Sequence, residues 1–153
     1  MSPELRWDLI PFNQLTLTQL YGLLRLRQDV FIVEQQCAYP DIDGLDQPAE
    51  HLLGWSTSGR LAACARLFAP AVRFPEASIG RVIVAEEARG CGVGHSLMAR
   101  AVEICRQNYG HVPIRIDAQA HLQAFYEQHQ FEVCSQPHMV DGILHVTMRR
   151  AAE

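Results

Sequence analysis

The residues with the clearest chemical potential are the alternating glycines of Arg89-Gly-Cys-Gly-Val-Gly94. This segment follows the β-branched run 79–84 and precedes a stretch with helical apolar spacing, so it predicts a turn between a strand and a helix. Backbone N–H groups at a helix start lack intrahelical acceptors, and glycine lets an anion approach them closely. A tight turn alone could also need these glycines. If they do more, the segment predicts a binding site for a pyrophosphate through main-chain donors.

Composition excludes several other phosphate-binding and catalytic motifs. All thirteen basic residues are arginine and lysine is absent, so neither a Gly-Lys-Ser/Thr nucleotide loop nor a Schiff-base lysine can be formed. A dinucleotide fingerprint that begins at Gly90 would need glycine at position 95, where the sequence has histidine. The net charge of −4 gives no general attraction for nucleic acid. Five cysteines without a C-x-x-C pair predict neither a disulfide framework nor a zinc site, and we expect no metal.

The elements that must position the glycine turn indicate one α+β domain over residues 1–153, with a core of about 6–150. Hydrophobic periodicity predicts strands near 6–10, 52–56, 61–68, 79–84, 112–117, 131–134 and 143–148. It predicts helices from Thr16 or Thr18 to about residue 34, from 94 to 107 and from 121 to 128. The expected architecture is a mixed, mostly antiparallel sheet of about seven strands flanked by helices. Without a leader or a membrane-length apolar run, we expect a cytoplasmic protein with no membrane partner.

The segment from Cys37 to Asp46 is the most acidic part of the chain, and its Pro, Gly and three aspartates predict a loop. Each carboxylate alone is expected to be a solvated charge or a turn former. Together they would attract a cationic substrate and raise its local concentration.

Two separate motifs carry a resemblance to a known superfamily. Arg89, Gly92 and Gly94 after the strand match the phosphate motif Gln/Arg-x-x-Gly-x-Gly/Ala, and the segment 124–131 resembles Leu-Tyr-Glu-x-x-Gly-Phe. Both are typical of the GCN5-related N-acetyltransferase (GNAT) superfamily. A narrower resemblance, to its bacterial ElaA branch, covers nearly the whole chain through segments 30–43, 79–84 and 118–122. The departures are His129-Gln130 where glycine usually precedes the Phe, and Gln119 where Asn often contacts the coenzyme.

The resemblance implies a GNAT-like acyl-CoA N-acyltransferase fold and an acetyl-CoA co-substrate. The acetyl group would pass to a small-molecule or peptide amine by direct attack in a ternary complex. The implied coenzyme-binding residues are Val82, Ile83, Val84, Arg89, Gly90, Cys91, Gly92, Val93, Gly94, His95 and Gln119. Tyr126 falls on the motif tyrosine and would be the general acid for the CoA thiolate, because a phenol is neutral at pH 7 and can donate a proton.

The base that deprotonates the amine is not determined by the motifs. Ser78 aligns where several superfamily members carry a glutamate; a hydroxyl cannot act as a base near neutral pH, but it could hold a water. Glu34 and Asp43 are the expected acceptor-side residues. The candidates for the base are Glu34, Asp41, Asp43, Asp46 and His121. Four other histidines are interpreted as structural or surface residues, namely His51, His111, His138 and His145.

Three alternatives stay open at this point. The missing glutamate allows a CoA-binding regulatory or interaction module with weak or no catalysis. Another acyl group could replace acetyl, because the volume beyond the thioester is not encoded in a linear motif. The closing strand pair offers an edge at which two copies could form a homodimer.

Overall fold

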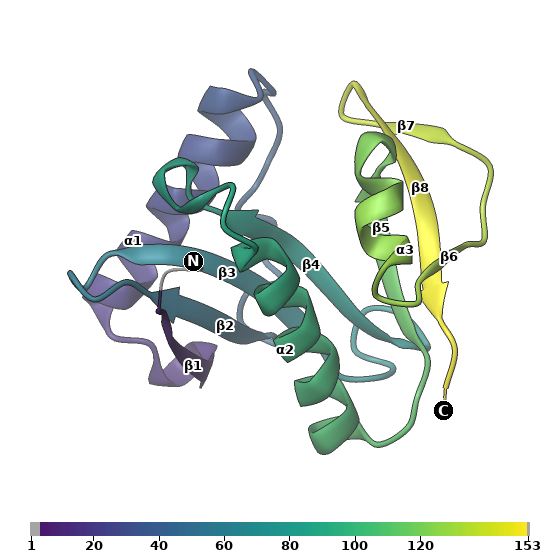
Figure 1. Ribbon diagram of the computed structural model, residues 1–153, viewed down its shortest axis with the longest axis horizontal. Helices are drawn as coiled ribbons and strands as arrows, with labels where there is room; N and C mark the ends of the chain where they lie inside the picture. The colour runs from purple at the N-terminus through teal and green to yellow at the C-terminus, as the bar shows by residue number, and fades with distance from the viewer. Residues whose placement is uncertain (1–3, 153) are drawn as a thin grey trace.

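The computed structural model describes residues 4–152, and within them the chain forms one eight-stranded sheet (Figure 1). Its strands are β1 (Arg6–Pro11), β2 (Glu50–Trp55), β3 (Leu61–Phe68), β4 (Ala77–Val84), β5 (Ile114–Gln119), β6 (Glu132–Val133), β7 (His138–Val140) and β8 (Ile143–Arg150). The spatial order is β1-β2-β3-β4-β5-β8-β6, and β7 also pairs with β8. Only β4 and β5 pair in parallel. The predicted mixed, mostly antiparallel sheet is confirmed; the sequence reading missed β7, a strand of three exposed residues.

The helices occupy both faces of the sheet. They are α1 (Leu17–Arg27), which continues into the π-helical η2 (Gln28–Glu34), α2 (Val93–Tyr109) and α3 (Gln123–Glu127), with short 3₁₀ turns η1 (Phe12–Gln14), η3 (Glu86–Ala88) and η4 (Ala120–Leu122). Figure 1 shows α2 across one face and α1 behind the other. Among residues 4–152, no helix combines the length and apolar character that a membrane crossing requires.

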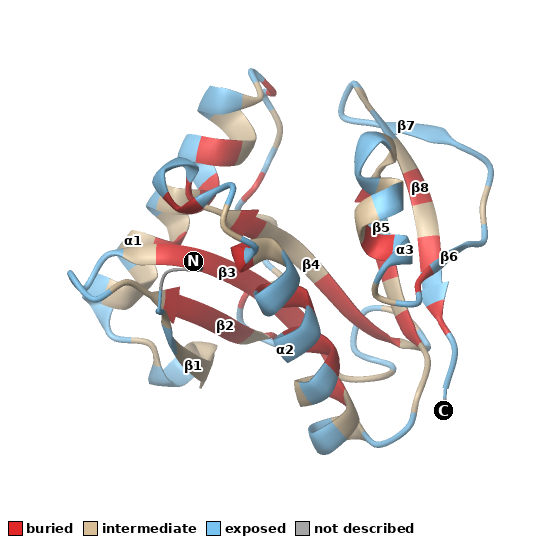
Figure 2. Cartoon of the chain, in the orientation of Figure 1, coloured by how far each residue is buried: buried red, intermediate tan, exposed pale blue. Residues whose placement is uncertain are grey.

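Buried side chains alternate between two clusters, which explains why β2 and β3 are almost wholly apolar. Leu52 and Ala63 belong to the cluster under α2, whereas their neighbours Leu53 and Cys64 belong to the cluster under α1. Successive strand residues point to opposite faces, so a strand covered on both sides must be apolar throughout. Figure 2 shows β2 and β3 buried along most of their length.

The first helix begins with a capping box and ends in a looser winding. The Thr16 side chain accepts a hydrogen bond from the Gln19 N–H at 3.1 Å, and the Gln19 side chain accepts one from the Thr16 N–H at 2.9 Å. Beyond Arg27 the pattern changes to π-helical bonds, such as the Gln35 N–H to the Val30 carbonyl at 3.1 Å. Such π-helical turns occur often at functional sites. The predicted helix to about residue 34 is confirmed in extent, though not in its winding.

A bulge in β4 redirects the strand halfway along. Its register against β3 shifts between the pairs Cys64–Ile83 and Arg66–Gly80, and Arg81 has a left-handed φ of 49°. Because of this extra residue, Ile79 packs in the cluster under α2 while Ile83 packs under α1. A regular strand would send both side chains to the same face. Bulges of this kind re-aim side chains beside functional sites.

The parallel strands β4 and β5 are joined at one end only. Their pairing consists of Ala77 with Ile114 and Ser78 with Arg115. Beyond these two pairs the strands separate, and Figure 1 shows β4 and the β5–β8 half diverging toward the top of the view. The sheet therefore has an internal opening between its two halves.

Candidate active site

A cavity of about 470 Å³ lies where β4 and β5 diverge. The helical segment η2, the loop after it, both separated strands, the start of α2, the η4–α3 segment and the β7–β8 hairpin all contribute to its walls. Its lining is Val30, Phe31, Glu34, Gln35, Cys37, Tyr39, residues 79–84, Arg89, Gly94, residues 116–119, His121, Leu122, Phe125, Tyr126, Val140, Asp141, Ile143 and His145.

The glycine turn presents main-chain donors beside this cavity. Gly92 is the N-terminal cap of α2 with a left-handed φ of 79°, and no side chain caps the helix. The first donor of the helical ladder is Ser96, whose N–H bonds the Gly92 carbonyl at 3.1 Å. Within residues 4–152, the N–H groups of Gly92, Val93, Gly94 and His95 have no acceptor. An anion at this helix start would be bound by these donors and by the helix dipole.

The edge of β4 supplies a second set of main-chain groups. The Ala85 N–H bonds the Ala62 carbonyl of β3 at 2.8 Å. Residues alternate in an antiparallel ladder, so Val84 directs its N–H and carbonyl away from β3, toward the opening. An extended amide-containing ligand could pair with this edge like an added strand.

Arg89 and Glu34 form an ion pair at the mouth of the cavity. The Arg89 Nη1 lies 2.9 Å from Glu34 Oε2, and its Nε donates to the Val84 carbonyl at 3.0 Å. The Arg89 side chain is 39% exposed and that of Glu34 is 40% exposed. The guanidinium therefore links the end of η2 to the end of β4, in addition to lying beside the glycine turn.

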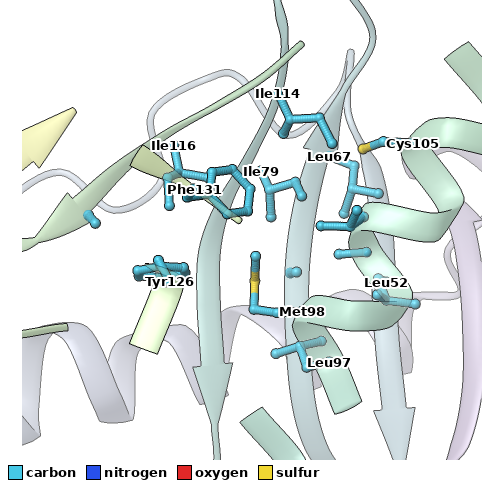
Figure 3. Close-up of a cluster of buried hydrophobic side chains, with 14 of the residues drawn as sticks. Leu52, Leu67, Ile79, Leu97, Met98, Cys105, Ile114, Ile116, Tyr126 and Phe131 are labelled. Carbon is cyan, nitrogen blue, oxygen red and sulfur yellow. The ribbon is translucent and has the colours of Figure 1, made fainter. Parts of the chain in front are cut away.

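An aromatic cluster fixes Tyr126 relative to the turn. Phe125 lies edge-on to Tyr126, with ring centroids 5.0 Å apart, and Tyr126 lies edge-on to Phe131 at 6.2 Å. His95 stacks on His129, and the His95 Nδ1 lies 3.0 Å from the His129 Nε2. Figure 3 shows Tyr126 among the buried side chains that α2 covers.

The Tyr126 side chain lines the cavity and is buried. It has no hydrogen-bond partner among residues 4–152, and burial raises the pKa of Tyr126 to about 12. A second tyrosine in the lining, Tyr39, instead donates to Asp41 Oδ1 at 2.6 Å. Burial and this hydrogen bond raise the pKa of Tyr39 well above its usual value.

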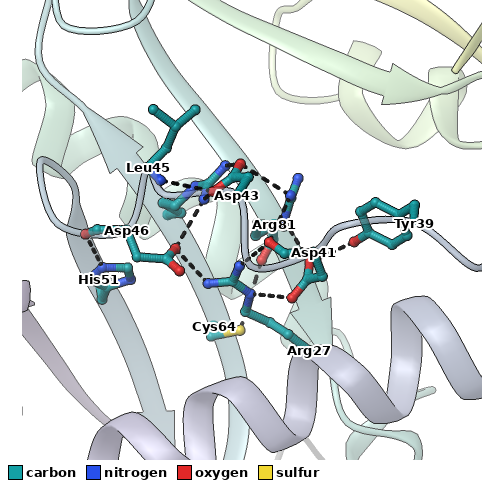
Figure 4. A network of polar contacts seen from close by, with 10 residues as sticks. Arg27, Tyr39, Asp41, Asp43, Leu45, Asp46, His51, Cys64 and Arg81 are labelled. Carbon is teal, nitrogen blue, oxygen red and sulfur yellow. Dashed lines mark hydrogen bonds and ion pairs between the residues drawn. The ribbon is translucent and has the colours of Figure 1, made fainter. Parts of the chain in front are cut away.

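The acidic loop 37–46 is a buried ion-pair network, so the expectation of solvated charges that attract a cation was wrong, although Asp43 also accepts a hydrogen bond from the Leu45 N–H at 3.0 Å, as a turn former does. Arg27 contacts Asp41 at 2.9 Å and Asp46 at 2.7 Å, while Arg66 contacts both oxygens of Asp43 at 2.8 and 2.9 Å. Figure 4 shows the contacts of Arg27 with Asp41 and Asp46, with Arg81 also bonded to the loop. Three arginines balance three aspartates, so the loop cannot supply the expected field for a cation.

The network also changes the titration of its members. Burial opposes ionisation of Asp46, but hydrogen bonds and charge from Arg27 and Arg66 outweigh it, and the pKa of Asp46 is lowered. The same balance, with Arg66 foremost among the partners, lowers the pKa of Asp43 well below its usual range. His51 donates from Nε2 to the Asp46 carbonyl at 2.9 Å, and burial lowers its pKa.

The residues predicted from the sequence are only partly brought together. Val82, Ile83, Val84, Arg89, Gly94, Gln119, Glu34 and Tyr126 line the cavity. Gly90, Cys91, Gly92, Val93 and His95 form the adjoining turn. Asp43 is bound by arginines and Ser78 is a buried residue, and neither belongs to the lining. The Ser78 hydroxyl is buried and has no hydrogen-bond partner among the described residues.

Sequence reasoning missed several polar residues of the cavity. Asp117 and His145 line it from β5 and β8, and Gln35 accepts a hydrogen bond from Gln119 at 3.1 Å. The sequence analysis interprets His145 as a structural or surface residue, whereas the structure places it in the cavity wall. The period-two alternation of β5 and β8 places polar residues on one face and could have indicated these positions. Without the pairing of the two strands, that alternation does not show which face borders a cavity.

Comparisons with known proteins agree with this geometry. A family model for the GNAT acetyltransferase domain matches residues 23–152. Protein ElaA of Escherichia coli strain K12 is 40% identical over 148 residues, which are 95% of this chain and 96% of ElaA. Its crystal structure superposes with a TM-score of 0.90 over 96% of this chain and 99% of that one. An acyl-CoA N-acyltransferase structure from Pseudomonas aeruginosa has 41% identity and a TM-score of 0.92 over 97% of this chain and 100% of its own.

A cleft between diverging parallel strands, a glycine turn with unbonded amides and a match over most of the chain lead to one assignment. The fold is that of the acyl-CoA N-acyltransferases, and the predicted resemblance is confirmed. The chain belongs to the GNAT acetyltransferase family.

Proposed function

We propose that this protein transfers an acetyl group from acetyl-CoA to a primary amine by direct attack in a ternary complex. The observation that carries the proposal is the set of unbonded N–H groups from Gly92 to His95, placed at the opening between β4 and β5. These donors fit a pyrophosphate, and the Val84 N–H, which points away from β3, fits an amide carbonyl of a pantetheine arm. The relative from Pseudomonas aeruginosa is described as an acyl-CoA N-acyltransferase, which supports the same chemistry here.

The chain would contribute binding, polarisation and a proton. When bound, acetyl-CoA supplies the activated acyl group as a thioester. A main-chain N–H of the segment from Val82 to Val84, such as that of Val84, would polarise the thioester carbonyl as negative charge develops on its oxygen. Gln119, held by Gln35, would orient an amide of the coenzyme.

Tyr126 is proposed as the general acid. Its raised pKa keeps the phenol neutral at pH 7, so that it can donate a proton to the departing thiolate. A phenol of pKa near 12 is a weak acid in water, but burial also raises the basicity of a thiolate. Cys64 and Cys105 illustrate this, because burial raises the pKa of each thiol to about 12. A CoA thiolate buried beside Tyr126 would likewise be a stronger base than in water.

Coenzyme binding is tested first and catalysis second. Because a ligand that binds only the native state stabilises it, acetyl-CoA at about 100 times its Kd should add about 2.7 kcal/mol to the unfolding free energy and raise Tm by on the order of 5 °C. Thiol release with a panel of small amines and peptides then tests transfer. An unchanged Tm at saturating coenzyme would contradict the proposal at its first step.

A second candidate function is supported by Ser78. The residue aligned with the expected glutamate is a serine outside the cavity lining, which favours a CoA-binding regulatory module without catalysis. A protein stabilised by acetyl-CoA but releasing no thiol with any amine of the panel would fit that alternative. Thiol release that depends on an amine would exclude it.

A further inference from the structure

The side chain of His145 is held in one tautomer at the wall of the cavity. It lies on β8, partly buried, with Nδ1 2.8 Å from the carbonyl oxygen of Ile143. A carbonyl can only accept, so Nδ1 carries the hydrogen. In the neutral ring the lone pair is therefore on Nε2. No other partner of the ring is found within residues 4–152, so Nε2 is not occupied by the protein.

Strand pairing places His145 on the face opposite Tyr126. In the β5–β8 ladder, Gln119 pairs with His145 and Asp117 with Thr147. The residues between them, Ala118 and Val146, belong to the buried cluster that contains Tyr126 and lies under α2. Because alternate residues of a strand point to opposite faces, Asp117, Gln119, His145 and Thr147 share the other face, the side of α1 and η2. A thioester held in the opening would have the phenol on one side and the imidazole on the other.

The groups around this face favour a cationic acceptor. Asp117 comes from β5, where its Oδ1 accepts from the Thr147 hydroxyl at 3.0 Å and lies 3.4 Å from Arg115, and Asp141 comes from the β7–β8 turn. Asp117 is paired with Arg115, Arg81 with Asp41 and Arg89 with Glu34, so Asp141 is the carboxylate of the lining for which no ion pair is found among residues 4–152. His121 on η4 also lines the cavity, and His138 on β7 pairs with His145. Unlike the ring of His145, that of His121 is exposed and has no hydrogen bond to fix it among the described residues.

We propose that His145 is the general base that deprotonates the acceptor ammonium, an inference that rests on the proposed function. One proton passes from the ammonium to Nε2, giving an imidazolium and a neutral amine. The nitrogen lone pair then forms a bond to the thioester carbon, and the C–S bond breaks as Tyr126 protonates the sulfur. The nitrogen of the new amide then loses its second proton to the Tyr126 phenolate, which restores the phenol. The imidazolium of His145 releases its proton to solvent. The products are an N-acetyl amide, free CoA and one proton.

The test compares His145→Asn with His138→Asn. The side-chain amide of asparagine can still donate to the Ile143 carbonyl in place of Nδ1, but it has no basic atom at the place of Nε2. His138 offers a matched control, because its Nδ1 makes a similar contact to Gln136 O at 3.0 Å from the paired strand, outside the cavity lining. We expect His145→Asn to lower kcat/KM for the amine by on the order of 10²-fold. The acetyl-CoA Kd and Tm should stay near those of wild type.

The pH profile separates a base from a structural residue. Wild-type kcat/KM should fall toward acid pH as the imidazole becomes protonated, and this limb should be lost in His145→Asn and His145→Gln but kept in His138→Asn. An unchanged rate and acid limb in both His145 variants, with active wild type, would overturn the role of His145 alone. Wild-type protein that binds acetyl-CoA but acetylates no amine would overturn the proposed function together with this base.

Discussion

At the scale of single residues, the cavity contains two tyrosines that differ in one contact. The Tyr39 hydroxyl is bonded to Asp41, whereas that of Tyr126 has no partner among the described residues. We predict that Tyr126→Phe lowers kcat by about 10²-fold, because the thiolate loses its proton donor, while acetyl-CoA affinity changes little. Steady-state thiol release and a coenzyme titration measure the two effects.

Tyr39→Phe is the matched control for this prediction. It removes the same atom from the same cavity but deprives buried Asp41 of a hydrogen bond, so it should cost about 1–3 kcal/mol of stability and leave kcat nearly unchanged. Equal losses of kcat in the two variants would show that Tyr126 is not a specific acid.

The glycine turn allows the same substitution to be made twice with opposite results. Gly92 has a φ of 79°, so Gly92→Ala should cost about 1 kcal/mol of stability and weaken acetyl-CoA binding by displacing the loop amides. Gly94 is inside the helix, and an added Cβ would meet Phe125 at 3.4 Å, an ordinary contact. The family motif also admits alanine there. Gly94→Ala should therefore keep coenzyme affinity and stabilise the helix by up to about 1 kcal/mol.

Calorimetric titration with acetyl-CoA and urea unfolding of both variants decide the point. Gly22→Ala in α1, where an added Cβ meets nothing within 4 Å, reports helix propensity away from the cavity. Loss of coenzyme binding in Gly94→Ala but not in Gly92→Ala would contradict the assignment of the amides.

At the scale of elements, the ion-pair network fastens the loop 37–46 to the sheet and to α1. Arg27 is 1% exposed and bonds both Asp41 and Asp46, and Arg66 on β3 bonds Asp43 and Asp46. Removing one partner leaves a buried charge uncompensated, which costs more than the pair itself contributes. We predict that Asp46→Asn lowers the free energy of unfolding by about 3 kcal/mol in urea titrations.

The control is Asp29→Asn, which breaks an exposed pair with Arg25 at 3.9 Å. That change should stay within about 0.5 kcal/mol, because water and salt screen such a pair. A loss of similar size in both variants would mean that burial does not determine the energetics of the network.

The network also marks the limit of what the sequence could predict. Strands, helices and the glycine turn follow from periodicity and from local backbone chemistry, and all but the exposed strand β7 are predicted to within a few residues. The aspartates of loop 37–46 gave no sign of their partners, because Arg27, Arg66 and Arg81 are brought to them by long-range packing. The same holds for His145, whose cavity wall is created by the pairing of β5 with β8. Local sequence patterns predict single helices and strands. A site whose residues come from several strands can be predicted only when the pairing register of those strands is known.

At the scale of the whole molecule, two sheet halves meet at two residue pairs and are bridged across the opening. Gln119 donates to Gln35 at 3.1 Å, the Cys37 thiol contacts the Asp141 carbonyl at 3.2 Å, and His95 contacts His129 at 3.0 Å. Each contact joins a residue of the half that contains β1–β4 to one of the half that contains β5–β8. A coenzyme seated between the halves would add contacts to both, so its binding should stabilise the molecule as one unit.

The stability of the whole molecule should decrease in two stages as the pH falls. The pKa of His51 is lowered by burial, so the unfolded chain takes up a proton first, below an imidazole's ordinary pKa of ~6.5. His129 contributes in the same range, because burial and the nearby His95 and Arg150 lower its pKa. The second stage begins near the ordinary carboxyl pKa of ~4, since Asp43 and Asp46 stay ionised in the folded state.

Urea unfolding between pH 8 and pH 3 measures both stages, and one substitution separates them. His51→Gln keeps a donor for the Asp46 carbonyl but does not titrate, so it should reduce the slope of stability between about pH 6.5 and 5 and leave the fall below about pH 4 in place. The slope that remains in the first range belongs to His129 and should be removed by adding His129→Gln. If the slope of stability between about pH 6.5 and 5 is unchanged in the double variant, acid destabilisation in that range arises outside these histidines. If the free energy of unfolding does not fall below about pH 4, the ion pairs do not depend on ionised aspartates.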